Sequence, residues 1–91
     1  MTITEIKQIL SKKISQKGYI LEERKSTTTD SWYFKIYSGT YSLMFRVANH
    51  SSGSNIITLR TDKKITRQQV ERFAVNRCND LSKRVVKEFL F

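Results

Sequence analysis

The chain has 91 residues, of which 38% are hydrophobic and ten are aromatic, so it can build one small core and is too short for two ordinary domains. Its 17 Lys and Arg residues against 8 Asp and Glu residues give a net charge of +9, and such a field attracts polyanions. We expect a single cytoplasmic domain without membrane association, because the lone cysteine cannot form an intramolecular disulfide, the start lacks the apolar core of a signal peptide, and no run approaches the roughly 18 apolar residues of a membrane helix.

The first predicted element is an amphipathic helix over residues 3–17. Its apolar residues recur at steps of three and four, which places them along one side of a helix: Ile3, Ile6, Leu10 and Ile14. Thr2 and Glu5 have the spacing of a capping box, and Gly18 is typical of the left-handed residue that ends a helix. The helix therefore has one apolar stripe to bury.

Four extended segments are predicted next, over residues 19–25, 32–37, 41–47 and 56–60. The second and third alternate apolar with polar side chains, which gives the sheet one strongly apolar face: Trp32, Phe34, Ile36, Leu43, Phe45 and Val47. Ser38-Gly39-Thr40 predicts a hairpin turn between these two, and residues 49–55 predict a loop. Because consecutive strands usually pair as neighbours, we expect an antiparallel meander.

The last predicted element is a long helix over residues 66–90, in which Thr66 and Gln69 have capping-box spacing. Its apolar residues again fall on one face: Val70, Phe73, Ala74, Cys78, Leu81, Val85 and Phe89. The order α-β-β-β-β-α predicts an α+β fold. In it, two helices pack on one face of a three- to four-stranded antiparallel meander and leave the other face open to water.

The residues offer no catalytic centre, metal site or cofactor motif. His50 is the only histidine and falls in the predicted loop without a neighbouring acid to orient it, so we expect it to cap backbone groups or touch a ligand phosphate. One Cys and one His cannot form a structural zinc site, and no glycine-rich phosphate loop is present. Glu22 and Glu23 fall on opposite faces of one strand, so they cannot act as a carboxylate pair. We therefore expect a non-enzymatic binding domain.

Basic residues gather at the start of the long helix. Lys63, Lys64 and Arg67 stand where free backbone amides already attract anions, and cations there oppose the helix dipole. A phosphate as the intended occupant explains this placement, although a solvated turn would give the same pattern.

The run KKITR at residues 63–67 resembles the lysine-rich motif that opens the second helix of double-stranded-RNA-binding domains. Those domains also run helix, three-stranded meander, helix. The resemblance implies that Lys63, Lys64 and Arg67 contact the phosphates of an RNA major groove. The Gly-Pro-x-His loop of that family is replaced here by residues 26–31, and the second helix is not rich in alanine.

A second resemblance involves the strands. Residues 31–33 (Ser-x-Tyr) and 43–50 (Leu-x-Phe-Arg-Val-x-Asn-His) resemble small proteins of phages and mobile elements. This resemblance implies a genomic origin and carries no assigned activity.

Two further surfaces are candidates to complete a nucleic-acid site. Aromatic and basic side chains are expected together on the open sheet face: Tyr33, Lys35, Tyr37, Met44, Arg46 and either Arg60 or Thr58. In single-strand platforms, rings stack on bases while cations hold the backbone, although such side chains also stabilise an exposed sheet by packing across strands. An outer strip of the long helix carries Arg72, Asn76, Lys83 and Lys87, which is otherwise an ordinary solvated face.

The sequence thus predicts a nucleic-acid-binding domain whose basic surface begins at the C-terminal helix. The sequence does not distinguish DNA from RNA, a single strand from a double strand, or a monomer from a homodimer. The alternative is a phage or mobile-element protein that binds and modulates an acidic host protein, with Leu90 and Phe91 as an apolar anchor.

Overall fold

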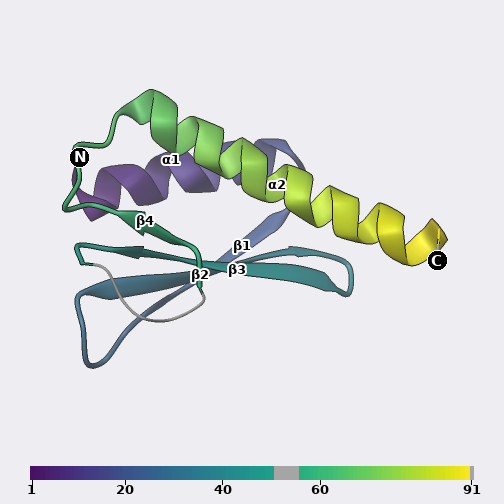
Figure 1. Cartoon of the computed structure of the whole chain (residues 1–91), viewed down its shortest axis with the longest axis horizontal. Coiled ribbons are helices and arrows are strands. Elements are labelled where there is room, and N and C mark those ends of the chain that lie inside the picture. Colours follow the sequence, from purple (N-terminus) through teal and green to yellow (C-terminus); the bar gives the residue numbers. More distant parts are fainter. Residues whose placement is uncertain (51–55, 91) are drawn as a thin grey trace.

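The computed structural model describes residues 1–50 and 56–90, without the side chains of residues 84–90. Its elements run in the order α1 (Ile3–Gln16), β1 (Ile20–Lys25), β2 (Ser31–Ser38), β3 (Tyr41–Ala48), β4 (Thr58–Arg60) and α2 (Arg67–Leu90). Figure 1 shows the two helices side by side over one face of a four-stranded sheet, both beginning at the same end of the molecule. The predicted α+β class and element order are confirmed. Neither described helix is both long and apolar enough to cross a membrane.

Both helices begin with the predicted capping residues. The Thr2 hydroxyl accepts a hydrogen bond from the Glu5 backbone N–H at 3.2 Å. At the second helix, the Gln69 N–H donates to the Thr66 hydroxyl at 3.2 Å, while the Thr66 N–H donates to the Gln69 side-chain oxygen at 2.9 Å. Gly18 follows the first helix with a φ of +83°, a conformation that favours glycine, so this residue determines where α1 stops.

The sheet has the strand order β1-β2-β3-β4, but it is not a complete antiparallel meander. β1 with β2 and β2 with β3 are antiparallel, whereas β3 and β4 are parallel, so the prediction is wrong for the last strand. β4 pairs only with Arg46–Ala48, at the end of β3. To pair in parallel with these three residues, the chain has to run back along β3 by only about 10 Å, at 3.3 Å per residue. A loop can cover this distance without a crossover helix.

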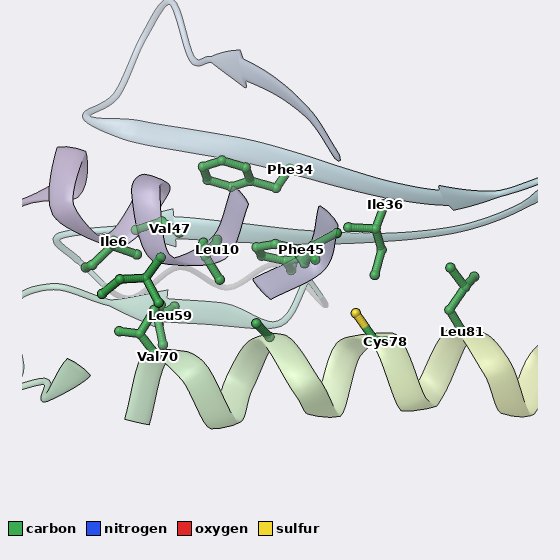
Figure 2. Packing of buried hydrophobic residues seen from close by; sticks show 13 residues of the cluster. Ile6, Leu10, Phe34, Ile36, Phe45, Val47, Leu59, Val70, Cys78 and Leu81 are labelled. Carbon is green, nitrogen blue, oxygen red and sulfur yellow. The ribbon is translucent and has the colours of Figure 1, made fainter. Parts of the chain in front are cut away.

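The core lies between the helices and the predicted apolar sheet face (Figure 2). The Phe34 and Phe45 rings stack with centroids 5.3 Å apart, and Phe73 of α2 meets Phe45 edge to face at 5.2 Å. The fully buried apolar side chains come from both helices and the two central strands: Ile6, Leu10, Ile14, Phe34, Ile36, Phe45, Val47, Ala48, Val70, Ala74 and Leu81. The side chains of Val85 and Phe89, which were also predicted to be in the core, lie outside the described part.

Candidate nucleic-acid interface

The direction of β4 decides where the basic start of α2 lies. Because β4 runs parallel to β3, its last residue Arg60 is beside Ala48. The chain then enters α2 at the end of the molecule where α1 also begins and where the β1–β2 loop turns (Figure 1). An antiparallel β4 would have delivered α2 to the opposite end, next to the β2–β3 hairpin. The strand direction that the sequence did not reveal thus positions the candidate site.

Lys63 and Lys64 are exposed, and neither has a hydrogen bond or ion pair in the described structure. The acid nearest to them in sequence, Asp62, is instead bonded by Arg60, whose Nε lies 2.9 Å from one carboxylate oxygen. The Arg60 hydrogen bond, with its charge, holds the pKa of Asp62 below the usual value. The two lysines are therefore exposed to a ligand at this end, and neither is held by an ion pair with a described residue.

The structure adds Lys12 of α1 to the predicted cluster. Lys12 and Arg67 line the same shallow hollow of about 260 Å³ between the starts of the two helices, together with Glu5. Arg67 is exposed and its Nε lies 3.1 Å from Glu71. Sequence reasoning missed Lys12 because its only signal was a polar position on α1. Lys12 comes close to the start of α2 only because of how the two helices pack against each other.

The outward side of α1 continues this surface with small polar groups. An open hollow along the helix is lined by two lysines and by hydroxyl and amide side chains: Thr4, Lys7, Gln8, Ser11, Lys12 and Ser15. Lys7 also pairs with Glu23 at 2.9 Å and lies 3.5 Å from the Trp32 ring centroid, so it is held in place rather than free to move. The residues that line this side of α1 are therefore all polar or basic in type.

The outer strip of α2 is exposed as predicted at Arg72, Asn76 and Lys83, and neither cation pairs with a described residue. Arg72 and Lys83 are separated by about 16 Å along the axis at 1.5 Å per residue. The fourth predicted member, Lys87, has a side chain outside the described part. The strip therefore extends the basic surface away from the start of α2.

The open sheet face carries Tyr33, Lys35 and Tyr37, as predicted, but their groups are already engaged with one another. The Tyr37 hydroxyl donates to Glu22 at 2.8 Å, and the Lys35 ammonium lies 5.2 Å from the Tyr37 ring centroid. Arg24, which sequence reasoning did not single out, lies 5.8 Å from the Tyr33 ring centroid. Each ring thus already has a cation over it, and an acid lies among them.

Arg46 corrects the prediction for this face. It was expected to be exposed there, yet its residue is only 4% exposed. Its Nε and one terminal nitrogen donate to the Thr58 hydroxyl at 3.2 and 2.9 Å. The parallel β4 places Thr58 directly beside Arg46, where its hydroxyl can accept these hydrogen bonds. Arg46 therefore cannot reach a phosphate on the surface.

The remaining residues with potential chemistry are tied into the fold. His50 Nε2 lies 3.4 Å from the hydroxyl of buried Ser31, and Asn49 donates to Asp30 at 3.1 Å, so the end of β3 is joined to the β1–β2 loop. Residues 51–55 of the predicted loop lie outside the described part. Burial raises the pKa of the Cys78 thiol. No group of three or more potential metal ligands occurs among the described residues.

The surplus charge is divided unequally between the two layers. Residues 19–62, the part of the sequence that contains the four strands, hold five Lys and Arg against four Asp and Glu, a net charge of +1. Residues 1–18 and 63–91, the parts that contain the two helices, hold twelve against four, a net charge of +8. Almost all of the excess positive charge thus belongs to the helical layer.

The comparisons with known proteins leave this site to be interpreted from its own residues. Neither the protein-family models, nor the curated proteins, nor the solved structures with which the chain was compared match it. A function has to be inferred from the gathered cations of the helical layer, namely Lys12, Lys63, Lys64, Arg67, Arg72 and Lys83, which we call the basic layer.

Proposed function

We propose that this chain is a non-enzymatic nucleic-acid-binding domain that holds phosphate backbones with its basic layer. The observation that carries the proposal is the division of charge, +8 on the helical segments against +1 on the sheet. A charge that served only to keep the chain soluble would need no such division. Cations gathered on one side create a directed field that captures a polyanion and exchanges its counterions.

The chemistry of the basic layer favours a duplex over a single strand. Proteins that bind single strands without sequence preference stack bases on aromatic rings. Among the described side chains of the two helices, the only ring is that of Phe73, and it packs against the core. The partly exposed rings of Tyr33 and Tyr37 lie on the opposite face of the sheet. Cations without rings suit a ligand whose bases are already stacked and whose phosphates are presented outward.

The test is a comparison of two triple variants that remove equal charge from the two layers. Lys63, Lys64 and Arg67 are replaced by Ala in one variant, and Arg24, Lys25 and Lys35 in the matched control. Binding of a labelled 20-base-pair duplex is measured by fluorescence anisotropy at several salt concentrations. If all three phosphate contacts are lost, the slope of log affinity against log salt should fall by about 2.7, at roughly 0.9 per contact. The control variant should keep the slope of the native chain.

Three results would contradict the proposal. An equal loss in both variants would mean that only the total charge matters, and an unchanged slope in the first variant would remove these residues from the site. An absence of any duplex or single-strand shift at about 50 mM salt would instead favour an acidic host protein as the partner of the same surface. Of the apolar anchor suggested for such a partner, neither Leu90's side chain nor Phe91 lies in the described part.

A further inference from the structure

The sheet face that the helices leave uncovered has a composition unlike that of the basic layer. Its outward side chains form rows across β1, β2 and β3, because Ile20 pairs with Tyr37 and Glu22 with Lys35, which also pairs with Met44. Ile20 is 66% exposed and Met44 47% exposed, which makes them two of the most exposed large apolar residues in the described chain. Tyr33 and Arg24 complete this surface, which we call the free face.

We propose that the free face binds a second copy of this chain, sheet against sheet. Aromatic, Met and Arg side chains are the types that are enriched at the centres of protein interfaces. They form here a contiguous patch with a hollow of about 240 Å³. Sheets commonly bury such a face by stacking on another sheet about 10 Å away.

Charge selects a second copy over an acidic partner. An acidic protein would be attracted to the basic layer, where the net charge is +8, rather than to the sheet, where it is +1. The free face instead carries both signs, with Glu22 directly across from Lys35 and next but one to Arg24. In a two-fold interface the same surface meets itself, so Glu22 of each copy can face Lys35 of the other.

The fold also keeps the repelling layers apart in such a dimer. Helices cover only the opposite face of each sheet (Figure 1), so sheet-to-sheet packing leaves both basic layers on the outside. At about 10 Å per layer they would be roughly 30 Å apart. This separation is several times the Debye length of about 8 Å at physiological salt. A dimer of this kind would present two phosphate-binding surfaces in opposite directions.

The size of the free face determines how tightly the proposed dimer is expected to associate. β1, β2 and β3 contain 6, 8 and 8 residues. At 3.3 Å per residue and about 4.8 Å between strands they cover roughly 350 Å² of sheet. Stable complexes bury about 800 Å² on each partner, so the dimer is expected to be weak and to form with rising concentration.

The first experiment is sedimentation velocity of the full chain from about 5 to 500 µM without nucleic acid. The sedimentation coefficient of the native chain should rise with concentration. Met44→Lys should weaken the dimer at least tenfold. Asn76→Lys is the matched control, because it adds the same charge at an exposed position of α2, on the other side of the molecule. A native chain that stays monomeric throughout, or equal effects of the two variants, would overturn the proposal.

The second experiment tests the two-fold pairing by exchanging charges. Glu22→Lys and Lys35→Glu should each dimerise at least tenfold more weakly than the native chain, because each puts like charges opposite one another. An equimolar mixture should restore association, since the lysine introduced in one variant then faces the glutamate introduced in the other. Thermal melting of each variant alone checks that it is folded. Folded variants that fail to restore association when mixed would rule out this interface. Neither experiment involves nucleic acid, so its outcome is independent of the proposed function.

Discussion

At the scale of single residues, the buried Arg46 shows how a cation can belong to the fold rather than to a binding surface. Its guanidinium is held by the Thr58 hydroxyl, which in turn donates to the Ile56 carbonyl at 3.2 Å. A hydrogen bond to a buried charge is worth more than one between neutral groups, because the charge is costly to leave without partners. The pair therefore fastens the short strand β4 to β3.

This role predicts a large effect from a small substitution. Thr58→Val removes an acceptor of the buried charge while keeping the size of the side chain, so the free energy of unfolding should fall by about 1.5–3 kcal/mol. Adding Arg46→Met removes the buried charge itself and should recover more than half of the loss, since the hydrogen-bond acceptor that Thr58 supplied to this charge is then no longer needed. Urea denaturation of the native chain, the two single variants and the double variant measures both effects. Additive losses in the double variant would show that the two side chains act independently.

At the scale of elements, the periodic segments could be predicted and the long-range arrangement could not. Apolar residues at steps of three and four identified both helices, and capping residues located their starts to within one residue. Alternation identified the inward faces of β2 and β3. These signals are local, because they depend only on the geometry of one helix or strand.

The direction of β4 had no local signal, since a three-residue strand has the same sequence pattern in either direction. Two further errors followed from it. Arg46 was expected on the surface because the register that pairs it with Thr58 was unknown, and the sequence allowed either Arg60 or Thr58 on that face. Lys12 was not connected with Arg67 because the relative placement of the two helices was unknown. Lys63 and Lys64 were found from sequence because they are adjacent in the chain.

The docking of α2 on the sheet can be tested through Cys78, which is 2% exposed. Burial raises the pKa of its thiol, so at pH 8 the reactive thiolate is disfavoured as well as shielded. A disulfide reagent should therefore label the native chain at least a hundredfold more slowly than the urea-unfolded chain. The matched control moves the thiol one residue along, as Cys78→Ser with Asn79→Cys, because Asn79 is exposed. This control should react at nearly the unfolded rate when native. Fast labelling of native Cys78 would mean that α2 leaves the sheet readily.

At the scale of the whole molecule, the basic layer and the free face differ in the kind of contact that they can make with a partner. The basic layer is suited to a ligand held entirely by salt-sensitive phosphate contacts, whereas the free face combines the apolar contacts of Ile20 and Met44 with Glu22–Lys35 pairs, so salt should weaken it less. Raising the salt concentration should therefore release nucleic acid before it separates the dimer. This order of release depends on the unequal distribution of charge between the helical layer and the sheet. The same 17 cations spread uniformly over the molecule would not produce it.

The same separation predicts how a ligand changes stability. A duplex that binds only the folded chain stabilises it by about 2.7 kcal/mol when the free ligand is at 100 times its Kd. For a domain of this size, each kcal/mol raises the Tm by roughly 4–8 °C, so an unlabelled duplex should raise the melting temperature by about 10 °C or more at low salt. Differential scanning fluorimetry measures this shift without a labelled probe. The variant that replaces Lys63, Lys64 and Arg67 by Ala should lose most of the shift, whereas the sheet variant that replaces Arg24, Lys25 and Lys35 should keep it. A shift that is equally reduced in both would show that the chain responds to its total charge, and that the helical layer has no special part in binding.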